Sequence, residues 1–179
     1  MNKKKTGSVS TCPPKSVMDM IRDMAVSKIP TRVVADDPDF IPEYKTDGAA
    51  CCDLRANMDK TGGSVNGVLP IHPHGTAIID CGFSMQIPSG YEAQIRCRSG
   101  WAANGLSVTN GIGTIDSDYR GRICVIVTNT TSNQVFFIKH KERIAQMCIK
   151  PVHQFLFEQA EALGTTDRQA GGFGSTGVS

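Results

Sequence analysis

Glycine or proline interrupts this chain about every 8–12 residues from residue 31 onward, and this spacing most limits the possible folds. Such segments are long enough for short β-strands but leave no room for the crossover helices of βαβ units. The stretch 91–98 also alternates, with Tyr91, Ala93, Ile95 and Cys97 predicted to point inward and polar residues between them. We therefore predict an all-β fold, a sandwich or barrel with little helix.

Three further stretches are predicted to be strands. The stretch 123–128 is apolar on both faces, as in a strand covered on both sides, and a subunit contact is one way to supply the second cover. The stretches 135–138 and 144–152 are expected to be the last two strands.

The two ends of the chain differ from this β region. Apolar residues recur at helical spacing over 16–27, which predicts a short amphipathic helix, either packed on the main domain or acting as a partner-binding arm. After Leu163 the composition is rich in glycine, so residues 164–179 are either a frayed terminus or a lid that orders over a ligand. We expect an extension over 1–27, a β domain over 28–163 and a mobile tail over 164–179.

Length, charge and cysteine usage exclude several classes of protein. The 179 residues suit one domain, and no apolar run reaches the roughly 18 residues of a membrane span. The basic start lacks the apolar segment of a secretory signal, and a net charge of +2 argues against a nucleic-acid partner. Seven cysteines without a C-x-x-C pair favour a reducing compartment. We therefore expect a cytoplasmic protein, in the host cytoplasm if the protein is viral. The four histidines lack zinc spacing.

Two segments carry groups that suit phosphate. Arg98-Ser99-Gly100 ends the alternating stretch with a planar guanidinium, a hydroxyl and a glycine that permits close backbone approach. The tail 172–177 matches G-x-G-x-x-G but does not lie between a strand and a helix, so we do not interpret it as a dinucleotide site. Its glycines and hydroxyls, together with Arg168, still suit a segment that wraps a phosphate.

The stretch 110–121 and Gln146 suggest a polar ligand and a reacting water. Asn110-Gly111 predicts a tight hairpin whose free main-chain groups can bond the edge of a base. Asp116 and Asp118 share a face if extended, and one carboxylate beside phosphates can take a proton from water. Gln146 lies among apolar neighbours, where a half-buried amide needs a hydrogen-bonding partner, whereas the Glu142/Arg143 pair is consistent with simple surface charge.

In this order and spacing, the segments resemble the five motifs of the trimeric dUTPase family over about residues 28–179. The motifs are 50–54, 98–100, 110–121, 142–147 and 168–177. This chain has Cys51 and Gln169 where the family usually has glycine, and Trp101 where leucine is common.

The resemblance implies a distorted jelly-roll-like β-barrel, a homotrimer with shared active sites, and Mg²⁺ held mainly by the substrate phosphates. It implies hydrolysis of dUTP to dUMP and pyrophosphate by water attack on the α-phosphorus, which keeps uracil out of DNA and supplies dUMP for dTMP synthesis. The implied catalytic residues are Asp116, which deprotonates the water, Asp53, which supports the magnesium ion through water, and Gln146. The implied substrate-binding residues are Arg98, Ser99, Gly100, Asn110, Gly113, Thr114, Ile115, Tyr119, Arg168, Phe173, Gly174, Ser175 and Thr176. Among these, Tyr119 would exclude a 2′-hydroxyl and Phe173 would stack on the base.

Two alternatives stay open at this point. A dCTP deaminase of the sister family would need a glutamate base in the third motif, where this chain has Ile115-Asp116-Ser117-Asp118-Tyr119. A dUTPase with an added regulatory role would use residues 1–27 to contact a partner that the sequence does not identify.

Overall fold

The computed structural model describes residues 28–172 of the chain. The predicted helix over 16–27 therefore lies outside the described residues, and so do the tail residues Phe173, Gly174, Ser175 and Thr176.

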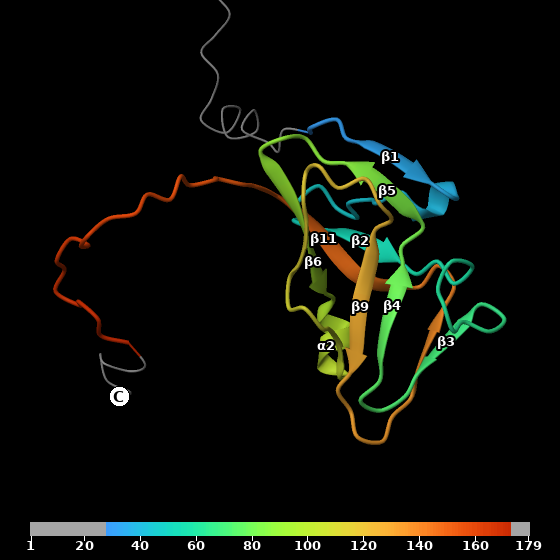
Figure 1. Cartoon of the computed structure of the whole chain (residues 1–179). Helices are drawn as coiled ribbons and strands as arrows, with labels where there is room; N and C mark the ends of the chain where they lie inside the picture. Colours follow the sequence, from blue (N-terminus) through green and yellow to red (C-terminus); the bar gives the residue numbers. More distant parts are fainter. Residues whose placement is uncertain (1–27, 173–179) are drawn as a thin grey trace, which may run out of the picture.

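The described part is built from short strands, which confirms the all-β prediction (Figure 1). The strands are β1 (Arg32–Ala35), β2 (Cys52–Arg55), β3 (Val68–Ile71), β4 (Thr76–Asp80), β5 (Phe83–Gln86), β6 (Tyr91–Cys97), β7 (Leu106–Val108), β8 (Gly113–Ile115), β9 (Cys124–Asn129), β10 (Phe136–Lys139) and β11 (Arg143–Pro151). Two short helical turns join them, the 3-10 turn η1 (Pro38–Phe40) and the helix α2 (Ser99–Ala103). None of the described helices is long and apolar enough to cross a membrane.

The strands form four antiparallel sheets around one core. The largest sheet has the order β2-β11-β6-β8, and a second has the order β4-β9-β7. The pairs β1-β5 and β3-β10 complete the wall, so hydrogen bonding does not close the jelly-roll-like barrel into one continuous sheet. The core contains the most deeply buried side chains, among them Leu54, Ile79, Phe83, Ile123, Val125, Ile138, Ile144 and Met147.

The alternation of β6 is confirmed. Ala93 and Ile95 are buried, Tyr91 and Cys97 pack against the core, and the polar residues between them face outward. In β9, by contrast, only Val125, Val127 and Asn129 are buried and the residues between them are half-buried. In the single chain β9 thus turns one face to the core and leaves the other half-buried, and complete cover of the second face stays a prediction that depends on a subunit contact.

The predicted hairpin at Asn110-Gly111 was also wrong. β7 pairs with β9 in one sheet, whereas β8 pairs with β6 in another, so residues 109–112 connect two sheets. Gly111 does adopt a left-handed conformation with φ 68°, and its N–H donates to the Val108 carbonyl at 3.2 Å. An Asn-Gly pair signals a tight turn, but the turn alone does not decide which strands pair.

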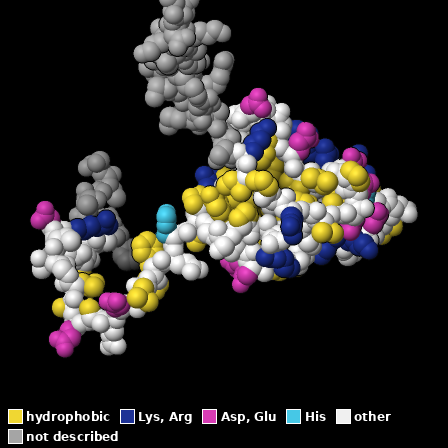
Figure 2. Space-filling model, turned by 90° about the horizontal axis from the view of Figure 1, so that it is seen from above, with side chains coloured by type: hydrophobic (Ala, Val, Ile, Leu, Met, Phe, Trp, Pro, Cys, Tyr) yellow, Lys and Arg dark blue, Asp and Glu magenta, His cyan; other side chains and the backbone are white. Residues whose placement is uncertain are grey.

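Beyond β11 the chain leaves the body as an extended segment over 152–172 (Figure 1). Hydrophobic side chains lie along it, away from the core (Figure 2). Phe155, Leu156 and Phe157 are 76%, 86% and 92% exposed. Consecutive large apolar residues with this exposure mark a segment that needs an apolar partner surface.

Candidate functional site

The largest sheet carries a carboxylate held between two guanidinium groups. Asp53 lies on β2 with its side chain only 15% exposed. Its Oδ1 pairs with Nε of Arg98 at 3.0 Å, and its Oδ2 accepts from Nη1 of Arg143 at 3.0 Å. Arg98 follows β6 and Arg143 begins β11, so three strands far apart in sequence bring these charges together.

Gln146 lies directly beside this cluster. The register of β11 places Gln146 opposite Asp53 on β2 and opposite Arg96 on β6. Its Nε2 donates to the Cys97 carbonyl at 2.9 Å. The predicted hydrogen-bonding role of this amide is therefore structural in the single chain, and its Oε1 remains available for a ligand or water.

The two arginines border a cavity of about 390 Å³ between α2 and the start of β11. It is lined by Arg98, Gly100, Trp101, Asn104, Glu142 and Arg143, and Ser99 is exposed beside it. The Trp101 indole N–H donates to the Arg143 carbonyl at 2.8 Å, and its ring meets Phe136 edge-on at 5.8 Å. The bulkier side chain at position 101 thus supports the wall of the cavity.

Sequence reasoning missed Arg143. It was interpreted as part of a surface charge pair with Glu142, but Glu142 instead accepts from the Lys139 backbone N–H at 2.9 Å. Arg143 pairs with Asp53 across 90 residues of sequence. Only the register of β2 on β11 reveals this contact, and no local spacing signals it.

A second group of predicted residues surrounds β8. This strand is at the edge of its sheet, so its backbone groups on the side away from β6 pair with no other described strand. Gly113 is buried under the Asn110 side chain, since a Cβ there would stand 3.1 Å from Asn110 Nδ2. Along Gly113, Thr114 and Ile115 the backbone groups that point away from β6 can donate and accept main-chain hydrogen bonds to a flat polar ligand.

Asp116 and Tyr119 lie on the turn that follows β8, and both are exposed. The Tyr119 N–H donates to the Asp116 carbonyl at 3.2 Å, and Arg120 donates to the carbonyls of Ser117 and Tyr119. In the described part of the chain the Asp116 carboxylate accepts no hydrogen bond. It is therefore free to accept a proton or a water.

The two groups lie apart within one chain. Ile115 pairs with Ala93, whereas Arg98 follows the opposite end of β6. At a rise of about 3.3 Å per residue, Ile115 and Arg98 are therefore about 17 Å apart along β6. The structure thus brings together Asp53, Arg98 and Gln146 and separates them from Asp116 and Tyr119.

The remaining predicted residue of the described chain, Arg168, lies on the extended tail. Its Nε donates to the Gly171 carbonyl at 2.8 Å, and it contacts neither group. The neighbouring Gln169 adopts φ 47°, in the left-handed region that favours glycine.

The thiols beside Asp53 do not have the lowered pKa of a nucleophilic thiol. Burial is the main cause that raises the pKa of Cys52 to about 11, and burial also raises the pKa of Cys51. A thiol needs a lowered pKa to be reactive near neutral pH. The chemistry of this region therefore falls to carboxylate, amide and guanidinium groups.

The residues at Asp53 fit a magnesium ion that is bound mainly by a substrate. Within residues 28–172 no three His, Cys, Asp or Glu side chains are arranged to hold a metal. Mg²⁺ often keeps several waters and binds through one or two carboxylates together with substrate phosphates. Asp53, with both oxygens already engaged by arginines, suits contact through water.

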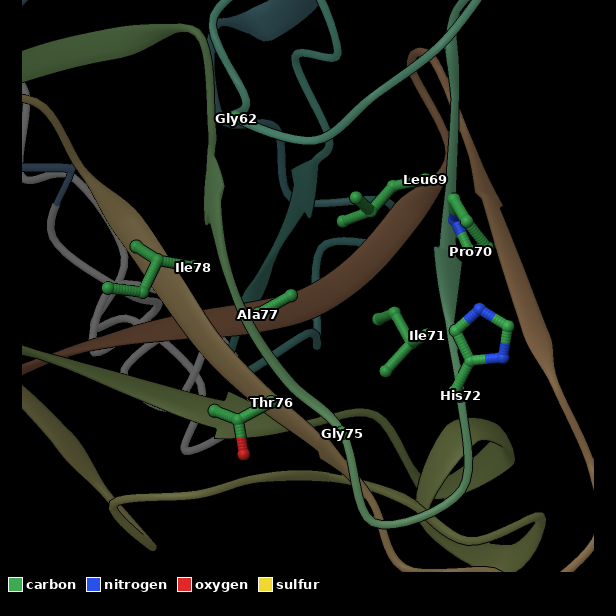
Figure 3. A pocket seen from close by; sticks show the side chains of 9 residues that line it. All are labelled: Gly62, Leu69, Pro70, Ile71, His72, Gly75, Thr76, Ala77 and Ile78. Atoms are coloured by element: carbon green, nitrogen blue, oxygen red, sulfur yellow. The ribbon is translucent and has the colours of Figure 1, made fainter.

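A larger cavity of about 530 Å³ lies between β3 and β4 (Figure 3). Its lining includes Leu69, Ile71, His72 and Ile78 but no predicted site residue. It lacks carboxylate and guanidinium groups, so the charged chemistry belongs to the smaller cavity.

The region of this chain that resembles known proteins includes both groups of residues. A family model described as dUTPase matches residues 39–177. The chain is 47% identical over 138 residues to the deoxyuridine 5'-triphosphate nucleotidohydrolase of Roseobacter denitrificans, covering 76% of this chain and 86% of that protein. It is 44% identical over 139 residues to the enzyme of the same name from Anaplasma marginale, covering 77% of this chain and 89% of that protein.

Solved structures share the fold at lower identity. A mutant of the Staphylococcus bacteriophage 80alpha dUTPase, solved with dUpNHpp, superposes with a TM-score of 0.70 at 21% identity and covers 84% of this chain and 100% of that one. A mutant of the dUTPase from phage phi11 of S. aureus, described with a structural Mg(II) ion, gives a TM-score of 0.64 at 18% identity, covering 76% and 100%.

Proposed function

This chain belongs to the dUTPase family and is an enzyme that hydrolyses dUTP, and we propose that it does so by water attack on the α-phosphorus to release dUMP and pyrophosphate. The sister activity, deamination of dCTP, is not favoured by these relatives. The observation that carries the mechanism is the cluster of Asp53, Arg98 and Gln146 beside the smaller cavity.

The cavity between α2 and β11 binds the triphosphate in this proposal. The Arg98 guanidinium has the planar fork that suits two phosphate oxygens, and Ser99 and Gly100 add a hydroxyl and an open backbone beside it. Arg143 keeps Asp53 in place when Arg98 turns toward phosphate. Positioning and charge neutralisation of this kind supply most of the catalysis in phosphoryl transfer.

The edge of β8 binds the nucleoside. The backbone groups along Gly113, Thr114 and Ile115 that point away from β6 hydrogen-bond the uracil edge together with Asn110. Tyr119 packs against the deoxyribose and leaves no space for a 2′-hydroxyl. Asp116 takes the proton of the attacking water, and Gln146 orients that water from the phosphate side.

A homotrimer with shared sites supports this division of roles. In one chain Ile115 and Arg98 lie about 17 Å apart along β6, and a neighbouring subunit that supplies one of the two groups would complete the site. The exposed apolar segment at 155–157 suits contact with another subunit. In this assembly the tail residues Arg168, Phe173, Gly174, Ser175 and Thr176 close over the base and the γ-phosphate.

We propose Mg²⁺ as the cofactor, with Asp53 holding it through water. The bound ion would neutralise charge on the triphosphate. We also propose that the enzyme works in the cytoplasm, which the six free thiols of the described chain support.

The first experiment measures pyrophosphate release from dUTP, dTTP, dCTP and UTP, with and without Mg²⁺. We expect rapid pyrophosphate release from dUTP and not from the other three nucleotides. Removing Mg²⁺ with a chelator should greatly lower the rate on dUTP. Ammonia release from dCTP would instead indicate the deaminase, and equal rates on dUTP and UTP would contradict the role of Tyr119.

A second experiment tests the shared site by co-expressing Asp116→Asn with Arg98→Leu. Each variant alone is expected to be nearly inactive, whereas mixed trimers regain activity because some sites combine an intact Asp116 with an intact Arg98. No recovery in mixed trimers would place both residues in the site of one subunit.

A further inference from the structure

Arg122 links the turn that carries Asp116 and Tyr119 to two distant segments. Its Nε and Nη2 donate to Asp80 at 2.9 and 2.6 Å, and its Nη1 donates to Asp36 at 2.9 Å. Asp80 ends β4 and is only 8% exposed, and Asp36 follows β1. One side chain thus fixes the end of the turn against two sheets.

Tyr119 contacts the backbone of this same residue. Its hydroxyl donates to the Arg122 carbonyl at 3.1 Å. A Cβ at Gly121 would stand 2.3 Å from the Tyr119 hydroxyl oxygen, so the tip of the tyrosine side chain lies directly against the glycine. The position of Tyr119 therefore depends on where the backbone of Gly121 and Arg122 lies.

The Arg122 side chain is engaged by two carboxylates. Asn57 also donates to Asp36 at 2.8 Å. The Arg122 guanidinium is therefore directed toward Asp36 and Asp80. Arg120 separately holds the turn by donating to the carbonyls of Ser117 and Tyr119.

We propose that Arg122 is a positioning residue that holds Tyr119 in the orientation that selects deoxyribose over ribose, with Asp80 and Asp36 as its anchors. This inference rests on the proposed role of Tyr119. When the anchor is weakened, Tyr119 samples other orientations and a 2′-hydroxyl gains access. Within the described residues no hydrogen bond joins the Asp116 carboxylate to Tyr119 or Arg122, so we expect the effect mainly in KM and in sugar discrimination, with little change in kcat.

Asp36→Asn is the variant that tests the anchor with least harm to the fold. The Asp36 side chain is 36% exposed, whereas removal of Arg122 would leave the buried Asp80 unpaired. Asp39→Asn is the matched control, since Asp39 lies on the same segment and pairs with Lys141 at 2.8 Å without contacting the turn.

The measurement is kcat and KM for dUTP and for UTP, with the melting temperature of each variant. An exposed ion pair of this kind is worth at most about a fivefold change in an equilibrium. We therefore expect Asp36→Asn to lower the dUTP/UTP ratio of kcat/KM by about two- to fivefold, mainly through a lower KM for UTP. Asp39→Asn should leave the ratio unchanged.

Tyr119→Phe adds a readout that a purely structural role would not change. This variant keeps the ring but removes the hydroxyl that reaches Arg122, so its effect and that of Asp36→Asn on the ratio should not add. Additive effects, an unchanged ratio in Asp36→Asn, or an equal change in Asp39→Asn would overturn the inference. If Asp36→Asn fails to fold, Arg122→Lys replaces it, because a lysine cannot bind both carboxylates in the same way.

Tyr119→Ala separates this inference from the proposed function beneath it. If this variant still rejects UTP, the role of Tyr119 itself is wrong. If Tyr119→Ala accepts UTP, the role of Tyr119 is supported. If Asp36→Asn (or its substitute Arg122→Lys) then still rejects UTP, only the anchoring role of Arg122 fails.

Discussion

Replacing Asp116 with asparagine should separate catalysis from stability. The change keeps the shape of the side chain and removes its ability to take a proton. Asp116 is exposed, and within residues 28–172 its carboxylate accepts no hydrogen bond, so we expect a stability change within about 0.5 kcal/mol. Its backbone carbonyl, which accepts from Tyr119 N–H at 3.2 Å, is unaffected. A general base contributes about 10²–10⁴-fold to rate, so kcat should fall by that factor, or about 3–5.5 kcal/mol in the barrier.

The assay combines three measurements on wild type and Asp116→Asn. Pyrophosphate release gives kcat, titration with a non-hydrolysable imido analogue of dUTP gives Kd, and thermal unfolding gives the melting temperature. We expect the large loss in kcat only, with Kd within a few-fold of wild type.

Two results would refute the reasoning. A kcat within tenfold of wild type would mean that another group accepts the proton. A melting temperature lowered by many degrees would mean that Asp116 supports the fold through contacts that the single chain does not contain.

Three further predictions concern stability. Asp53→Asn should lower the free energy of unfolding by about 1–3 kcal/mol in urea titrations, because Asp53 is largely buried between two guanidinium groups, and it should also abolish turnover. Leu54→Ala should cost about 2–5 kcal/mol by the same titration, since Leu54 is 1% exposed, and a cost below 1 kcal/mol would contradict the described core. The hydrogen bond from Arg122 is the largest cause that lowers the pKa of Asp36 below its ordinary value of 3.8. A lowered folded-state pKa means that this contribution is present above pH 3.8 and is lost as the pH falls further. Asp36→Asn should therefore be less stable than wild type near neutrality, and the difference between the two should shrink as the pH falls below 3.8.

Local patterns predicted those parts of the fold that depend on neighbours in sequence. The alternation of β6 follows from residue types alone, because side chains two apart share a face of a strand. The strands at β10 and β11 were likewise found close to their observed bounds. The ordered motifs indicated the residues that now line the cavity at Arg98.

Contacts between distant strands were not predictable in this way. Arg143 meets Asp53, and Arg122 meets Asp36, only because sheets formed elsewhere bring them together. A charged residue beside another charged residue in sequence gives no sign of such a distant partner. The turn at Gly111 shows the same limit, since its conformation was predictable but the change of sheet was not.

The two positions where the family usually has glycine behave differently. Gln169 adopts φ 47°, a conformation that costs a residue with a side chain about 1–2 kcal/mol. Cys51 does not have a positive φ, so a side chain is accommodated there without that cost. The sequence shows a departure from glycine at both positions, but only the backbone φ angle shows that the departure is costly at Gln169 and not at Cys51.

β11 lies between β2 and β6, and every pairing it makes joins residues many positions apart. The loops that these pairings close are long, so their entropy is lost before the strands stabilise one another. We therefore expect Asp53, Arg98 and Gln146 to meet only at a late stage of folding. A refolding chain should regain compactness well before it regains the ability to bind a triphosphate, and limited proteolysis during that interval should cleave within β11.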